Sequence, residues 1–227
     1  RMALATVSRG LGMFSDASAE YETLIQKFPD KTDLNYYLAE SLTQEGEIGK
    51  AIDAYDALEN SVGMNEAISI QKYKLYNSLN EPEKAMKEIE KLAAKYPMEP
   101  RYQIVMGDLY LEKNNTDKAL LCYNKAHEID PANPYYIVSM ANYYEMVGDK
   151  EAAETQIRSA LVNNDLDVET KVNILSRYIV RLQQNKQDVE GANILFQTLL
   201  EQHPEETQLK LMYGSLLAMQ EKTEEAR

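Results

Sequence analysis

Small and large apolar residues recur along the chain at a fixed period. One series consists of seven alanines: Ala17, Ala51, Ala85, Ala119, Ala153, Ala192 and Ala226. Neighbouring members are 34 residues apart, with a single gap of 39 between Ala153 and Ala192. Apolar residues follow four and seven positions after the first six alanines, as Tyr21 and Leu24 follow Ala17. These offsets place the side chains on one face of an α-helix. The pattern predicts one such helix in every repeat.

A second helix is predicted ahead of each alanine helix. Small residues lie twelve positions before five of the alanines, at Ala5, Ala39, Gly107, Ala141 and Gly214. Between the two helices stand residues that tolerate a left-handed backbone, namely Gly12, Gly46, Asn80, Asn114 and Gly148. Prolines follow four of the alanine helices, where a proline ends a helix or begins a connection: Pro29, Pro97, Pro131 and Pro204. The chain should therefore consist of about thirteen helices in consecutive pairs, with no β-sheet.

The stretch from Met106 to Pro131, MGDLYLEKNNTDKALLCYNKAHEIDP, carries a more specific pattern. It resembles a tetratricopeptide repeat, whose 34-residue period and order of glycine, tyrosine, alanine, aromatic residue and proline fall here on Gly107, Tyr110, Ala119, Tyr123 and Pro131. The resemblance covers essentially the whole chain.

The resemblance implies an all-α, right-handed α-solenoid of stacked antiparallel helix pairs, forming a single domain over residues 1–227. About seven repeats are expected, the first and last of them incomplete. Their approximate bounds are 1–31, 32–65, 66–99, 100–133, 134–167, 168–206 and 207–227, and they are called repeats 1 to 7 below. The chain reads as a segment of a longer protein.

Three departures from the family pattern stand out. There is no tryptophan, and its space is expected to be filled by Leu34, Ile68, Tyr102, Tyr136 and Leu209. Repeat 3 has Lys72 and Tyr73 where an apolar and a small residue are expected, which predicts a splayed helix pair. Repeat 6 has five extra residues between Tyr178 and Ala192, which should lie in the connection or lengthen the flanking helices.

In this family the first helices of the repeats line a concave face, so one row of residues is a candidate for partner contact. Three positions before the small residue come Tyr36, Ile70, Ile104, Val138 and Val172, which either seal neighbouring first helices together or touch a partner directly. Lys74, Asp108, Leu111 and Asn142 flank this row. Together these nine residues are the predicted partner-binding set.

One position after the small residue stand Glu40, Lys74, Asp108, Asn142 and Ser176, which should project into the same groove. Chaperone-tail binders of this family hold a terminal carboxylate there with asparagine and basic residues. Asn142 alone matches, and Glu40 and Asp108 would repel such an anion. A carboxylate clamp is therefore not expected.

Charge and composition exclude several other functions. With 24 Lys+Arg against 37 Asp+Glu, the formal net charge of −13 argues against a nucleic-acid partner. No apolar run is long enough to span a membrane. The two histidines, His127 and His203, lie near the ends of alanine helices, where the helix dipole favours them. Cys122 is expected to pack inside the repeat. Phosphate-loop and catalytic motifs are absent, and no metal, cofactor or catalytic residue is predicted.

The sequence thus predicts a non-catalytic scaffold that binds a protein or peptide partner on its concave face. Two alternatives stay open: the chain is a docking or sensory arm of a larger enzyme or signalling protein, or it self-associates through the ends of the solenoid. The helix endings YETLIQKFP, EIEKLAAKYP and FQTLLEQHP are similar to those of bacterial cell-envelope tetratricopeptide proteins. This similarity favours the envelope, with the cytoplasm as the alternative.

Overall fold

A computed structural model describes the backbone of residues 1–184 and 190–225, and the side chains of residues 1–180 and 192–218. Within these residues the chain forms thirteen α-helices and no strand, which confirms the predicted fold class. The helices fall into two compact parts, Arg1–Pro97 and Met98–Arg227, which are described separately.

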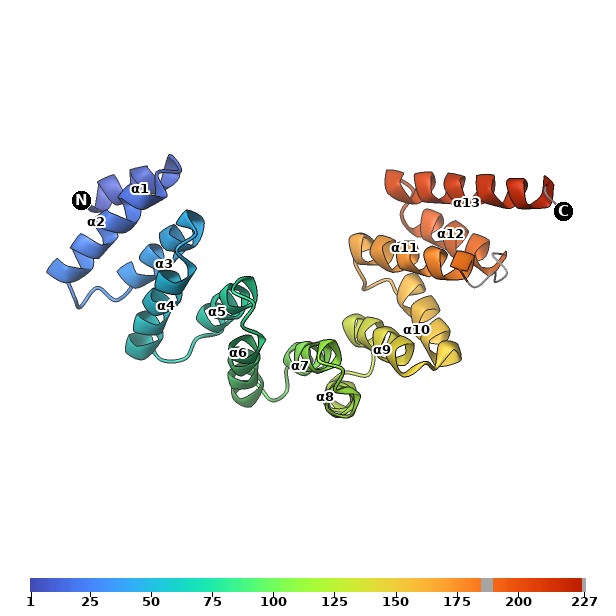
Figure 1. Cartoon of the computed structure of the whole chain (residues 1–227), viewed down its shortest axis with the longest axis horizontal. Helices are drawn as coiled ribbons and strands as arrows, with labels where there is room; N and C mark the ends of the chain where they lie inside the picture. Colours follow the sequence, from blue (N-terminus) through green and yellow to red (C-terminus); the bar gives the residue numbers. More distant parts are fainter. Residues whose placement is uncertain (185–189, 226–227) are drawn as a thin grey trace. The chain divides into compact units, whose positions relative to one another are not determined.

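The N-terminal part contains repeats 1 to 3 as three helix pairs. They are α1 (Met2–Gly10) with α2 (Phe14–Lys27), α3 (Leu34–Glu45) with α4 (Ile48–Val62), and α5 (Glu66–Ser78) with α6 (Pro82–Lys95). Each second helix also contacts the first helix of the following pair, α2 with α3 and α4 with α5. The first helices lie along one side of this part and the second helices along the other (Figure 1).

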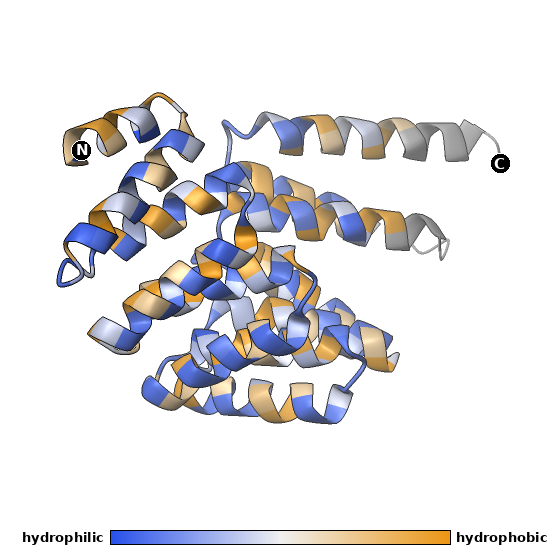
Figure 2. Cartoon of the chain, turned by 60° about the vertical axis from the view of Figure 1, so that its left-hand side comes forward, coloured by the Kyte–Doolittle hydropathy of each residue, from blue (hydrophilic) through white to orange (hydrophobic). Residues whose placement is uncertain are grey.

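The C-terminal part contains repeats 4 to 7. Its helices are α7 (Pro100–Glu112), α8 (Thr116–Ile129), α9 (Pro134–Val147), α10 (Lys150–Val162), α11 (Val168–Gln184), α12 (Glu190–Gln202) and α13 (Thr207–Glu225). In both parts, hydrophobic and hydrophilic residues alternate along each helix (Figure 2). This amphipathic pattern lets one face of each helix pack against the neighbouring helices.

The turns within the pairs have the predicted backbone conformation. Gly12, Gly46, Asn80, Asn114 and Gly148 all have positive φ, between 56° and 88°. The two asparagines, Asn80 and Asn114, are the only described residues other than glycine with positive φ. Asparagine tolerates this region better than other side chains, so the same turn is built in all five repeats. The four predicted prolines all lie in the turns between repeats.

The repeated alanines, where described, are fully buried in the core. Each of the six described members of the series, from Ala17 to Ala192, has no exposed surface, whereas Ala226 lies outside the described residues. Gly107 shows how close the helices come: a Cβ atom there would lie 2.3 Å from Cε1 of Tyr123 on α8. At Gly214, on α13, a Cβ would meet nothing within 4 Å, so close packing does not explain that small residue.

The residues predicted to fill the tryptophan space do so in most repeats. Leu34, Ile68, Tyr102 and Leu209 are all buried. Tyr136 is half-buried, and its ring lies 5.0 Å from that of His127. The prediction is confirmed for the four buried positions. At the fifth, Tyr136 is only partly buried and contacts the His127 ring.

Two further expectations concern repeats 3 and 6. The splaying expected in repeat 3 is wrong: α5 and α6 pack together as the other pairs of this part do, because Lys72 is held by an ion pair 3.0 Å from Glu88 on α6. In repeat 6, α11 has 17 residues, against 13 in α5 and α7, so part of the insertion lengthens this helix. The connection expected within residues 182–191 falls largely on residues 185–189, which lie outside the described residues.

Candidate functional site

A groove of about 380 Å³ opens on the first-helix side of the N-terminal part. Its lining residues come from all three first helices, with one contribution from each of α2 and α4: Arg9, Phe14, Glu40, Thr43, Gln44, Tyr55 and Gln71. The lining combines amide and hydroxyl groups with two aromatic rings. A groove of this kind offers hydrogen bonds to a peptide backbone as well as apolar contact.

Charges in this groove are paired with each other. The Arg9 guanidinium lies 2.6 Å from the Glu40 carboxylate and stacks over the Tyr37 ring at 5.0 Å. Burial raises the pKa of Tyr36, and its hydrogen bond to Glu40 raises that pKa further. Glu40 therefore has partners inside the protein, and the groove presents an ion pair rather than a free anion.

The predicted partner-binding residues of the N-terminal part differ in exposure. Tyr36 and Ile70 are half-buried, on α3 and α5, and Lys74 is exposed on α5. The Tyr36 ring makes edge contacts with Tyr37 and with Tyr55, one of the groove residues. Tyr36 thus lies beside the groove, and part of its surface stays open.

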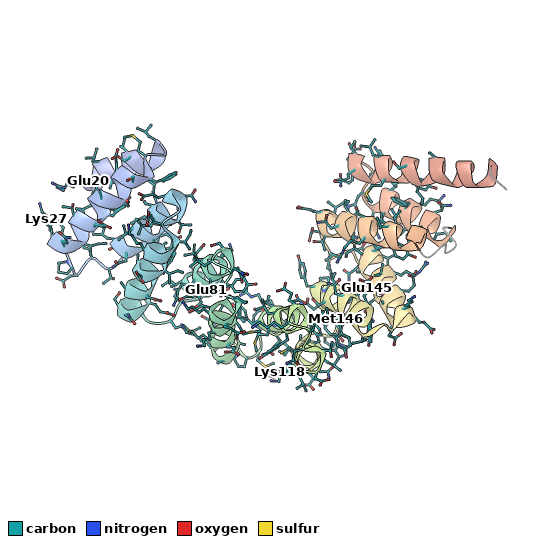
Figure 3. All side chains as sticks on the ribbon, in the orientation of Figure 1. Glu20, Lys27, Glu81, Lys118, Glu145 and Met146 are labelled. Carbon is teal, nitrogen blue, oxygen red and sulfur yellow. The ribbon has the colours of Figure 1, made fainter. Side chains whose placement is uncertain are left out.

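In the C-terminal part, a smaller cavity of about 10 Å³ lies between α9, α10 and α11. Val138 and Asn142, two residues of the predicted partner-binding set, line it. Arg177 of α11 donates a hydrogen bond to Asn142 Oδ1 at 3.3 Å, which bridges two first helices. Glu145 lies at the end of α9 on the first-helix side, whereas Lys118 lies on α8 on the opposite side (Figure 3).

The remaining predicted residues lie deeper. Ile104, Leu111 and Val172 expose between 4% and 6% of their surface. Leu111 packs with Ala119 and Tyr123, and Val172 packs in the core formed by α9 to α13. Their burial favours the packing role that the sequence left open beside partner contact.

Asp108 does not project freely into a groove as the sequence suggested. Its Oδ1 accepts a hydrogen bond of 2.8 Å from the Tyr123 hydroxyl on the second helix of the same repeat. Burial raises the pKa of the Asp108 carboxyl, although the hydrogen bonds from Tyr123 and Ser139 act in the opposite direction. The side chain is therefore part of the packing between α7, α8 and α9.

The described residues contain neither a cluster of metal-ligating side chains nor a helix suited to span a membrane. No group of three or more histidine, cysteine or carboxylate side chains among them could hold a metal ion. Over the same ranges, no helix combines the length and apolar character needed to cross a bilayer. Cys122 is buried, as expected.

Family models match two stretches of the chain. A model described as "Tetratricopeptide repeat" covers residues 2–62, and one described as "TPR repeat" covers residues 107–148. Both matches support a protein built from multiple tetratricopeptide repeats. Proteins of this family are generally interaction scaffolds rather than enzymes, and they take proteins or peptides as partners.

Relatives of known sequence or structure agree with this assignment. Cellulose synthase operon protein C of Pseudomonas fluorescens (strain SBW25) is 26% identical over 138 residues, which are 59% of this chain and 11% of the relative. The chain thus matches a small fraction of that protein's length.

Among solved structures, a tetratricopeptide repeat protein from Parabacteroides merdae ATCC 43184 has a TM-score of 0.63 at 16% identity and covers 92% of this chain and 94% of its own. MamA has a TM-score of 0.57 at 19% identity, covering 70% of this chain and 87% of its own. YrrB, described as a TPR protein with an unusual peptide-binding site, has a TM-score of 0.55 at 14% identity and covers 80% of this chain and 88% of its own. At these identities the likeness shows the tetratricopeptide fold.

None of the seven lining residues belongs to the predicted partner-binding set, and only Glu40 is predicted from the sequence to project into a groove; the missed residues include Arg9, Gln44 and Gln71. Arg9 and Gln44 follow the small residues Ala5 and Ala39 by four and five positions, and Gln71 precedes the small position of its repeat by two. Long polar side chains at these places on successive first helices were the available signal, because those faces turn toward the same groove.

Proposed function

We propose that this tetratricopeptide solenoid is a scaffold that binds a segment of another protein, peptide or helix, on the side formed by its first helices. The observation that carries the proposal is the groove of about 380 Å³ lined by Arg9, Gln44 and Gln71. Amide side chains can both donate and accept hydrogen bonds, so they suit a backbone whose sequence varies. Phe14 and the open part of Tyr36 add apolar contact.

The mixed lining also indicates how binding should respond to salt. Arg9 and Glu40 neutralise each other, and the amides carry no charge. Affinity therefore comes from shape, hydrogen bonds and apolar contact more than from long-range attraction, and salt should weaken it little. In the N-terminal part, Tyr36, Ile70 and Lys74 retain surface for contact. In the C-terminal part, Val138 and Asn142 retain surface, whereas Ile104, Leu111 and Val172 are buried.

The test is a selection from a displayed random peptide library, followed by affinity measurement on variants. Gln44→Lys with Gln71→Lys changes the groove at two surface positions without altering a buried contact. Selected peptides should lose at least about tenfold in affinity for this double variant, which corresponds to about 1.4 kcal/mol. Lys125→Glu, an exposed change on the second helix α8, is the matched control and should bind as the wild type does. Equal binding by the double variant, or loss in the control alone, would move the site to the second-helix side or the turns.

The match to a relative of which it covers 11% supports the alternative that the solenoid serves as a docking arm within a longer protein. The sequence of the full-length chain decides this point. Placement at the bacterial cell envelope and self-association through the ends of the solenoid stay predictions.

A further inference from the structure

A lysine ammonium lies buried among three carboxylates in the N-terminal part. Lys72 on α5 exposes 2% of its surface. Its Nζ lies 2.6 Å from Asp56 Oδ1, 2.8 Å from Glu59 Oε2 and 3.0 Å from Glu88 Oε1. A second ammonium, that of Lys91, lies 3.0 Å from Glu88 Oε1 and 3.6 Å from Glu59 Oε2. These five residues, called the lysine cluster, connect α4 of repeat 2 with α5 and α6 of repeat 3.

Three members of the cluster occupy positions that are apolar and buried in several other repeats, although Glu20 and Gln156 stand at the Glu88 position and His127 at the Glu59 position elsewhere. The position of Lys72 holds Leu38, Met140 and Ile174 elsewhere. The position of Glu88 holds Ala54, Cys122 and Leu195, and that of Glu59 holds Ala93 and Leu161. The three charged residues meet at one point, so each compensates the others. At this junction, ion pairs replace the apolar contacts found at the same positions in other repeats.

The cluster works only while its carboxylates are ionised. Burial by itself disfavours the charged form of Lys72, but hydrogen bonds to Asp56, Glu59 and Glu88 raise the pKa of Lys72 above its usual value. Burial likewise acts to raise the pKa of Glu59, and the two lysines lower it to below its ordinary value. Lys72 therefore stays protonated at neutral and acidic pH. The cost of burying its charge is offset only by the carboxylates around it.

We propose that the lysine cluster is a charge-dependent joint, which holds the helix pair α5–α6 on α4 at neutral pH and lets that pair open when its carboxylates take up protons. This role goes beyond the binding function proposed above and does not depend on it.

The direction of the pH effect follows from the sign of the shift. A carboxyl whose pKa is lowered by folding stabilises the protein above its unfolded pKa, about 4.3 for glutamate, and this contribution is lost as the pH falls through the folded pKa. Once the pH has fallen through the folded pKa of Glu59, the buried Lys72 ammonium no longer faces a charged Glu59. Tyr76 on α5 also faces the cluster, but burial, together with the charge of Asp56, raises its pKa, so it stays neutral in acid.

Native-state hydrogen exchange of the whole chain, corrected for intrinsic rates, measures this opening. Between pH 7 and pH 4 the open population of α5–α6 amides should rise by up to about threefold relative to that of α1–α2 amides, which is the largest change that one glutamate with an unfolded pKa of about 4.3 can produce at pH 4. The comparison variant combines Glu59→Leu, Lys72→Leu and Glu88→Ala, which introduces the residues of other repeats. Its α5–α6 amides should lose the excess acid response. Lys84→Gln, at an exposed lysine of α6, should keep it.

Glu59→Gln provides a second measurement that does not require acid or a repacked core. It imitates the protonated side chain, so at pH 7 it should already raise the opening of α5–α6 selectively. An α5–α6 response to acid no larger than that of α1–α2, the same excess in the triple variant, or unchanged opening in Glu59→Gln would each overturn the proposal.

Discussion

Repeats 3 and 4 have the same helical pair and the same type of turn, yet their interiors are built in opposite ways. In repeat 4, Gly107 lets the Tyr123 ring lie directly against the backbone of α7. In repeat 3 the corresponding position holds the half-buried Tyr73, and its neighbour Lys72 enters a network of ion pairs. The period of 34 residues therefore fixes where the helices turn and approach, but it does not fix what kind of contact fills the space between them.

The difference also changes how each repeat responds to its surroundings. The contact in repeat 4 depends on shape, because close packing tolerates almost no added volume. The contact in repeat 3 depends on the charge state of side chains that come from three helices. A substitution or a change in pH should therefore damage one repeat and spare the other.

The largest expected effect is that of Lys72→Met. It leaves Asp56, Glu59 and Glu88 close together with Lys91 as the nearby cation, and breaking a partly buried ion network in this way should cost about 3 kcal/mol. Urea unfolding gives the free energy of unfolding. Lys74→Met, two positions along the same helix and exposed, should change it by less than about 0.5 kcal/mol. Similar small losses in both variants would show that the network contributes little.

Gly107→Ala should destabilise repeat 4 by about 1–3 kcal/mol, because the Tyr123 ring has to shift to make room for the new methyl group. Gly49 is the matched control, since it lies in α4 with open space around its Cβ position. There the same substitution should stabilise the protein by about 0.5 kcal/mol through helix propensity. Thermal or urea unfolding compares the two, and a stabilised Gly107→Ala would contradict the close approach of the helices.

The smallest expected effect is that of Asp108 on how the free energy of unfolding changes with pH. The pKa of Asp108 is raised by burial, so its contribution to stability is present below its unfolded pKa and declines as the pH rises through the folded value. This is opposite to the acid loss expected for Glu59. Asp108→Asn should remove that decline, with a change below about 1 kcal/mol between pH 4 and pH 7. Unfolding measured at both pH values would refute this if the variant kept the wild-type slope.

The helix pairs, the turns and the closest contacts could be predicted from the sequence because each depends on a single residue type at a fixed position. Asn80 and Asn114 need only their own tolerance of positive φ, and the alanines only their small size. The lysine cluster could not be predicted in this way. From the sequence alone, Lys72 is expected to splay the helices. Its actual effect depends on carboxylates from two other helices, which the position of Lys72 in its own repeat does not indicate. A search for charged residues at the apolar positions of the repeat would have found Glu59 and Glu88 as well as Lys72. It would have indicated that these residues pair with each other.

The candidate groove was predicted only in part for a related reason. The row through Tyr36 and Val138 lies on the first helices, which also supply most of the groove lining. A row taken at one fixed offset contains both buried and exposed residues, so it does not define a groove. Whether a side chain such as Ile104 is covered depends on the size of its neighbours. Groove residues such as Gln71 lie at other offsets, because successive helices rotate against each other.

The contacts between helices determine how the chain folds and how it unfolds under force. Helices that touch are neighbours or next neighbours in the chain, such as α1 with α2 and α7 with α9. Loops closed by such contacts are short, so structure can begin at several places and spread along the chain within a short time. Under a pulling force applied to its ends, the same chain should lengthen in steps of a repeat at a time. The step that releases α5–α6 should occur at lower force in acid, since that pair is held by charge.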